Sequence, residues 1–174
     1  QLLVPANYYE NVPGNRYGTY ECNGKKIGVI NLIGRVDMNI LSNNPFTVAE
    51  KIIDEIKEKT DIIIIDFHAE ATAEKIALGY YLDGKVSIII GTHTHVQTAD
   101  EKILKNGTAY ITDIGMTGPI DSVIGMEKKA SIKRFVTTLP EKYKIAEGES
   151  KFNSCLFELD DETGRIDKIT RINM

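Results

Sequence analysis

The fold of this chain is decided by residues 62–95, which read IIIIDFHAEATAEKIALGYYLDGKVSIIIGTHTH. The near-continuous apolar run Ile62–Phe67 predicts a strand that is buried on both faces, and Val86–Ile90 predicts a second one. Residues 71–82 between them have a helical pattern, and we expect its apolar side to consist of Ala73, Ile76, Ala77 and Tyr80. A strand–helix–strand order with short connections implies parallel neighbouring strands. The stretch therefore predicts an α/β fold.

A hairpin and a helix are predicted before this stretch. Asn23-Gly24 is the favoured pair for a type I′ turn, and it lies between two strand-like segments within residues 19–32. Further along, Asn44 can cap a helix and Pro45 suits its first turn. Apolar residues then recur at helical spacing, at Val48, Ile52, Ile53 and Ile56.

The second half of the chain is predicted to contain more β structure than helix. Asn106-Gly107 indicates a hairpin whose return strand is Thr108–Thr112. A loop follows over Gly115–Gly125, and a helix is expected over Glu127–Thr138, before Pro140. The last two strands are expected over residues 153–159 and 165–172, joined by a turn over residues 160–164.

Composition is typical of a globular protein. Hydrophobic residues make up 42% of the 174 residues, charged residues make up 26%, and the formal net charge is −4. Because the two signs of charge are interspersed, no stable nucleic-acid complex is expected. The longest apolar runs fall short of the about 20 residues that a membrane helix needs. The two cysteines, Cys22 and Cys155, match no metal or redox spacing, which favours a cytoplasmic protein with reduced thiols.

The beginning of the sequence leads to a further expectation. The chain opens on Gln1 rather than on methionine. We therefore expect residues 1–174 to form one domain that lacks its N-terminal segment. That segment, or another copy in a homo-oligomer, would then cover a sheet edge left open.

All three histidines of the sequence follow the predicted buried strands. His68 comes after the first strand, and His93 and His95 come after the second. Ligands bind at the carboxyl ends of parallel strands in open α/β sheets, and imidazole is the commonest metal ligand among side chains. Residues two apart in an extended segment point to the same side, and Gly91 lets the chain turn as it leaves the strand. The three histidines are therefore predicted to bind metal.

The residues around the histidines leave the kind of metal site open. Three histidines fit a mononuclear site with an open position or part of a dinuclear one. Asp66 and Glu70 flank His68 and are predicted to accept hydrogen bonds that fix its tautomer. A His-x-His pair also begins the metal site of amidohydrolase barrels, but those need further histidines and a barrel of about 250 residues.

Several long strings resemble the YmdB-like, calcineurin-type metallophosphoesterases. They are DFHAEAT (residues 66–72), GYYLDG (79–84), GTHTHVQTAD (91–100), AYITDIGMTGP (109–119) and DSVIGM (121–126). The resemblance extends from Pro5-Ala6-Asn7 to the last predicted strand. It implies a calcineurin-like metallophosphoesterase sandwich, with two β-sheets flanked by helices and the N-terminal portion missing. The wider superfamily has Gly-His-x-His, whereas Thr92 separates Gly91 from His93 in this chain.

The resemblance also implies a function. The chain would belong to a phosphodiesterase that hydrolyses 2′,3′-cyclic nucleotides, 2′,3′-cyclic AMP among them, through a hydroxide bridging two metal ions. Iron or manganese is expected, with zinc and magnesium as alternatives. His68 and His93 would hold one metal and His95 the other.

The other parts of the family's site have no counterpart in this chain. The family's Asp, bridging Glu, Asn ligands and general-acid His are expected in the missing N-terminal segment, so no catalytic residue is assigned here. Asn7 and Asn31 are interpreted as structural. Thr117, Gly118 and Ser122 are candidates for binding the substrate phosphate, with an ordinary surface loop as the alternative. The competing hypothesis is a truncated, non-catalytic module that binds metal or a partner.

Overall fold

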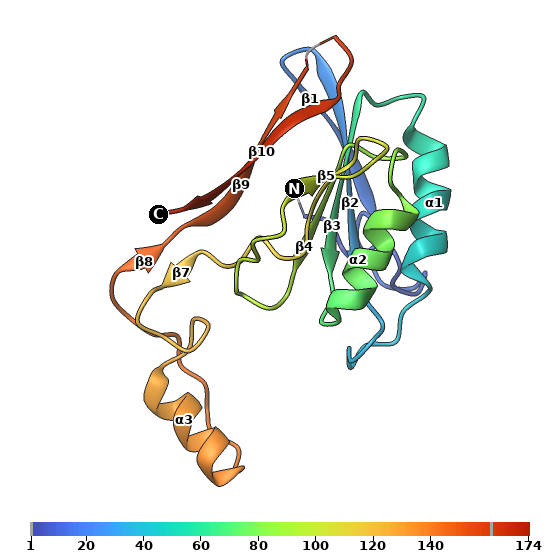
Figure 1. The fold of residues 1–174 in the computed structure, drawn as a ribbon. Coiled ribbons are helices and arrows are strands. Elements are labelled where there is room, and N and C mark those ends of the chain that lie inside the picture. Colours follow the sequence, from blue (N-terminus) through green and yellow to red (C-terminus); the bar gives the residue numbers. More distant parts are fainter. Residues whose placement is uncertain (1, 161) are drawn as a thin grey trace.

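The computed structural model of the protein describes residues 2–160 and 162–174. Its largest element is a six-stranded sheet in the order β1-β2-β3-β4-β6-β5 (Figure 1). The strands are β1 Tyr17–Cys22, β2 Lys25–Ile33, β3 Ile62–His68, β4 Ile88–Thr92, β5 Lys102–Ile103 and β6 Ala109–Ile111. Strands β2, β3, β4 and β6 run parallel, and β1 and β5 pair antiparallel at the two edges. The predicted parallel neighbours, β3 and β4, are confirmed.

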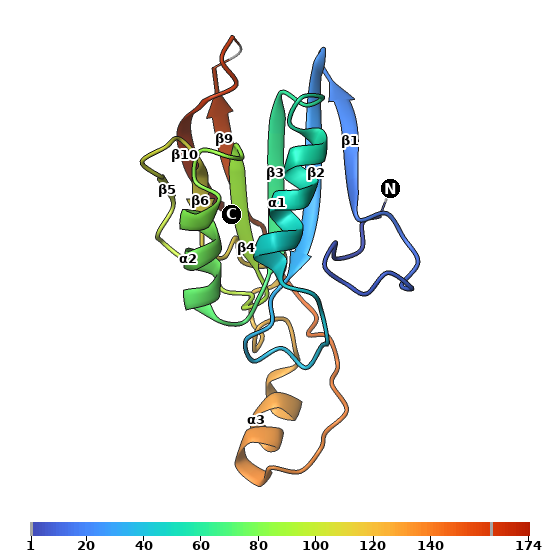
Figure 2. The same ribbon diagram turned by 90° about the vertical axis from the view of Figure 1, so that its right-hand side faces the viewer.

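Two helices and a β-ribbon cover opposite faces of this sheet. Helices α1 (Pro45–Ile56) and α2 (Thr72–Tyr81) lie on one face, and the ribbon of β9 (Asn153–Leu159) and β10 (Ile166–Asn173) lies on the other (Figures 1 and 2). On the ribbon side, Ile166 packs with Ile88 and Ala109. The predicted α/β class is confirmed. The predicted sandwich has a second β-sheet that is covered by its own helices. In this chain the two-stranded ribbon of β9 and β10 occupies that position.

The remaining elements stand beyond the carboxyl ends of the parallel strands. Strands β7 (Gly118–Pro119) and β8 (Ser150–Lys151) pair antiparallel, and helix α3 (Lys128–Thr137) extends away from the sheet (Figure 1). The predicted turn over residues 160–164 includes Asp161, which lies outside the described residues, as does Gln1. None of the helices in residues 2–160 and 162–174 has the length and apolar character that a membrane crossing requires.

Local sequence signals placed several elements correctly. Asn23 and Gly24 have φ values of 49° and 78°, as a type I′ turn requires, and join β1 to β2. The Asn44 side chain accepts a hydrogen bond from the Phe46 amide at 3.0 Å, and Pro45 begins α1. These signals act within a few residues, so the rest of the fold does not alter them.

The buried side of α2 was predicted wrongly except at Ile76, which packs against the core. Tyr80 is 61% exposed, whereas Lys75, Leu78 and Gly79 face the core. Gly79 lies against the ring of Tyr110, so closely that an added Cβ would come within 2.8 Å of it. A lysine and a glycine occupy core positions here, and an apolar pattern cannot identify them.

Asn7 ties the N-terminal loop to the end of β2. Its side chain is fully buried, donates to the carbonyl oxygens of Ile33 (2.7 Å) and Asn43 (3.0 Å), and accepts from the Ile33 amide (2.9 Å). These contacts agree with its interpretation as a structural residue.

Removing the Asn7 side chain should destabilise the protein. We expect Asn7→Ala to lower the free energy of unfolding by about 2–3 kcal/mol, because it leaves buried backbone groups of Ile33 without partners. Urea denaturation measures the change. Asn15→Ala, at an exposed asparagine, is the matched control and should change stability by less than about 0.5 kcal/mol. Equal effects of the two substitutions would contradict the role given to Asn7.

Candidate metal centre

The candidate site lies at the carboxyl end of β3 and β4. The two strands are parallel, and their register places His68 beside Thr92. His68 is the last residue of β3, and His93 follows directly after β4. The sheet therefore brings together two residues that are 25 positions apart in sequence.

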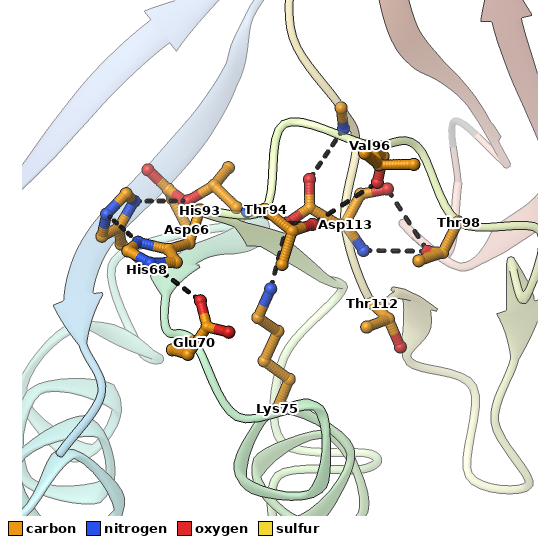
Figure 3. A network of polar contacts seen from close by, with 12 residues as sticks. Asp66, His68, Glu70, Lys75, His93, Thr94, Val96, Thr98, Thr112 and Asp113 are labelled. Atoms are coloured by element: carbon orange, nitrogen blue, oxygen red, sulfur yellow. Dashed lines mark hydrogen bonds and ion pairs between the residues drawn. The ribbon is translucent and has the colours of Figure 1, made fainter. Parts of the chain in front are cut away.

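The imidazoles of His68 and His93 face each other. His68 Nε2 and His93 Nδ1 are 2.9 Å apart, and the ring planes meet at 80° (Figure 3). Two nitrogens that are each bonded to one metal ion at about 2.0–2.1 Å are themselves about 3 Å apart. The spacing and chemistry of this donor pair thus fit a shared metal ion.

Thr92 and Asp66 set the tautomer of His68. The Thr92 hydroxyl has one hydrogen and donates it to Asp66 Oδ1 at 2.9 Å. The Thr92 oxygen therefore accepts from His68 Nδ1–H at 3.2 Å, so the neutral His68 ring has its free lone pair on Nε2, the atom that faces His93. Burial, together with the nearby His93, lowers the pKa of His68 from 6.5, which favours the neutral ring.

The two predicted acceptors occupy different places around the histidine pair. Asp66 is linked to His68 by hydrogen bonds through Thr92, and it also accepts from Asn31 at 2.9 Å. Burial raises the pKa of Asp66 above 3.8, although the hydrogen bond from Thr92 opposes this shift. Glu70 does not contact His68 as expected. Its carboxylate lies 3.0 Å from His93 Nε2 instead (Figure 3).

His95 is placed by a different contact. Its Nδ1 lies 3.0 Å from the carbonyl oxygen of Ile124, and because a carbonyl can only accept, His95 carries its proton on Nδ1. The segment is not extended as predicted, since His93 and His95 have positive φ values of 122° and 64°. The rule that residues two apart share a side therefore does not apply.

Two of the three histidines are thus in contact. Within residues 2–160 and 162–174, no three His, Cys, Asp or Glu side chains together form a group that could hold a metal ion. His68 and His93 also border a cavity of about 530 Å³. Its other lining residues are Pro5, Tyr8, Asn31, Ile33, Asp37, Met38, Asn39 and Ile40.

The sequence did not point to Asp113, which follows β6 at the same edge of the sheet. Its carboxylate accepts from Lys75 Nζ at 3.0 Å, from the Thr94 amide at 2.9 Å and from the Thr94 hydroxyl at 2.7 Å (Figure 3). Burial by itself would raise the pKa of Asp113, but these hydrogen bonds and one from Gly115 lower it below 3.8. The histidines were selected by the strand-end rule, which says that ligands bind at the carboxyl ends of parallel strands. This rule would also have selected Asp113.

Gly91 was predicted to let the chain turn as it leaves the strand, but its role in the structure is to allow close packing. It lies inside β4, and a Cβ added to it would come within 1.7 Å of the carbonyl oxygen of Thr112. Glycine is therefore required because the chain after β6 passes directly over β4.

The predicted phosphate-binding residues lie in the loop that follows Asp113. The Ser122 hydroxyl donates to the Pro119 carbonyl at 2.7 Å and accepts from the Gly125 amide at 2.9 Å, which closes a turn. Gly118 belongs to β7, and Thr117 is exposed. The loop reaches the histidines through Ile124, whose carbonyl binds His95.

Comparisons with known proteins identify the family. A model described as "YmdB-like protein" matches residues 1–172. The chain is 50% identical to the 2′,3′-cyclic-nucleotide 2′-phosphodiesterase of Bacillus subtilis (strain 168), over 98% of this chain and 64% of that protein. It therefore spans less than two thirds of the length of this relative.

Two solved structures have the same fold. A hypothetical protein from Thermus thermophilus superposes with a TM-score of 0.91 at 38% identity, covering 99% of this chain and 66% of the other. A structure described as a novel phosphatase from Mycoplasma pneumoniae superposes with a TM-score of 0.90 at 37% identity, covering 99% and 63%. The chain belongs to the YmdB-like protein family.

Proposed function

We propose that this chain is part of a metal-dependent phosphodiesterase that hydrolyses 2′,3′-cyclic nucleotides. The observation that carries the proposal is the 2.9 Å contact between His68 Nε2 and His93 Nδ1 at the carboxyl edge of the sheet. It supports a role for both residues in holding one metal ion. The Bacillus subtilis relative, 50% identical over 98% of this chain, bears the name 2′,3′-cyclic-nucleotide 2′-phosphodiesterase.

His95 is proposed to bind a second metal ion through Nε2. Its Nδ1–H is engaged by the Ile124 carbonyl, which leaves Nε2 as the nitrogen with a free lone pair. When bound, a pair of iron or manganese ions would supply positive charge for the phosphate and make an attacking water more acidic. Thr92 and Asp66 orient His68 for this task, and Glu70 faces His93.

The remaining ligands and the general acid are proposed to lie outside this chain. The chain has three histidines, and its match covers 64% of the Bacillus subtilis relative. A preceding segment that completes a two-sheet metallophosphoesterase domain would supply them. The cavity of about 530 Å³ beside His68 and His93 has the size of a small-ligand site, and Thr117, Gly118 and Ser122 remain predicted phosphate contacts.

A metal-depletion experiment tests the proposed function. The full-length protein loaded with Mn²⁺ should hydrolyse 2′,3′-cyclic AMP, lose this activity in EDTA and regain it when Mn²⁺ or Fe²⁺ is restored. 3′,5′-cyclic AMP serves as the matched substrate control. Turnover that chelation does not affect would contradict the proposal. Metal binding without turnover would favour the non-catalytic module instead.

A further inference from the structure

One buried carboxylate connects the segment between the histidines to the core. Asp113 Oδ2 accepts three hydrogen bonds, from Lys75 Nζ and from both the amide and the hydroxyl of Thr94 (Figure 3). The side chains of Lys75 and Asp113 are each only 1% exposed. Lys75 thus balances the buried charge, and the carboxylate keeps acceptor capacity for Thr94.

Thr94 is the residue that needs such an anchor. It lies between His93 and His95, whose positive φ values are costly for residues other than glycine. Backbone of this kind persists only where surrounding contacts hold it in place. Two hydrogen bonds from one residue to one oxygen fix Thr94 firmly and thereby fix the direction in which both histidines leave the backbone.

The same carboxylate also reaches the loop that orients His95. Its Oδ1 accepts from the Gly115 amide at 2.9 Å. The loop that begins there continues to Ile124, whose carbonyl accepts from His95 Nδ1–H. Asp113 therefore joins three parts of the chain: α2 through Lys75, the His93–His95 segment and the loop over residues 115–125.

We propose that Asp113, with Lys75 as its counter-charge, is a positioning residue of the metal centre: it holds Thr94 so that His93 and His95 face their metal ions. This inference rests on the proposed function, in which both histidines are ligands. The competing explanation is an ion pair that only stabilises the core. A buried pair of that kind can often be replaced by apolar residues without loss of stability, and this property separates the two explanations.

Two kinds of variant separate positioning from stability. Thr94→Val replaces the hydroxyl by a methyl group and leaves the buried ion pair intact, while Thr94→Ser keeps the hydroxyl. The double variant Asp113→Leu with Lys75→Met replaces the pair by apolar side chains and removes the carboxylate that accepts from the amide and the hydroxyl of Thr94. Asp83→Asn is the matched control. Asp83 accepts from the amides of Asn106 and Thr108 near the amino ends of β4 and β6, away from the histidines.

Two measurements on the full-length protein provide the readouts. The first is the affinity for Zn²⁺ by isothermal titration calorimetry. The second is the ¹⁵N spectrum of the three imidazoles in the metal-free protein, which reports the tautomer of each ring. Thermal melting of every variant shows which ones remain folded.

Thr94→Val should weaken Zn²⁺ binding about 10-fold, and the double variant up to about 100-fold, the range found when partners of metal ligands are removed. Both should convert the His95 ring from the Nδ1–H form to a mixture of tautomers. Thr94→Ser should keep the affinity within about threefold of the wild type, and Asp83→Asn should leave affinity and tautomers unchanged.

The inference is overturned if Thr94→Val and the double variant fold, bind Zn²⁺ like the wild type and keep the wild-type imidazole spectrum. If the wild type itself binds neither Zn²⁺ nor Mn²⁺, the proposed function fails. The metal-free spectra still decide whether Asp113 orients His95, so the two failures can be told apart.

Discussion

His93→Ala is expected to reduce hydrolysis of 2′,3′-cyclic AMP by the full-length protein at least about 10³-fold. The substitution removes one of the two nitrogens that face each other at 2.9 Å and leaves Glu70 without its partner. A metal ion contributes several kcal/mol to stabilising charge in a phosphoryl transition state, and each 1.36 kcal/mol corresponds to about tenfold in rate. Steady-state kinetics with saturating Mn²⁺ measures the loss.

The stability of the His93→Ala protein should change little, because the ring is partly exposed at the edge of the sheet. Lys168→Ala is the matched control, since Lys168 is an exposed residue of β10 that pairs with Glu158. It should retain wild-type activity. A folded His93→Ala protein with near-wild-type turnover would rule out His93 as a ligand that the reaction needs.

Gly91→Ala is expected to cause the largest loss of stability among single substitutions near the site. The new methyl group would come within 1.7 Å of the Thr112 carbonyl oxygen, so β4 and the chain after β6 would have to separate. Overpacking of this kind costs about 3 kcal/mol. For a chain of this size, that lowers the melting temperature by roughly 6–12 °C. Thermal denaturation followed by circular dichroism measures it.

Gly118→Ala is the matched control for this substitution. A Cβ at Gly118 would meet nothing nearer than the Met116 side chain at 3.8 Å, and no positive φ is required there. Its melting temperature should stay within about 2 °C of the wild type. Equal melting temperatures for Gly91→Ala and Gly118→Ala would contradict the close contact between β4 and Thr112.

The fold was predictable where short-range signals determine it. The Asn23-Gly24 turn, the Asn44 cap and the apolar run before His68 each act within a few residues, and all three elements formed as predicted. The face of α2 was not predictable. Lys75 is buried because of Asp113, a residue 38 positions away, and local periodicity contains no information about that partner.

The candidate site was predictable in part, for a similar reason. The strand-end rule placed His68 and His93 together, because parallel register converts two distant residues into neighbours. It could not show that Glu70 faces His93 or that His95 turns to Ile124. Those contacts depend on positive φ angles at His93 and His95, which residue types alone do not reveal.

Anomalous diffraction from Mn²⁺-loaded crystals of the full-length protein, collected at the manganese absorption edge, would show directly whether the histidines bind metal. We expect an anomalous peak bonded to both His68 and His93, with a second peak at His95. Manganese bound elsewhere, with His68 and His93 still in direct contact and no peak between them, would contradict it.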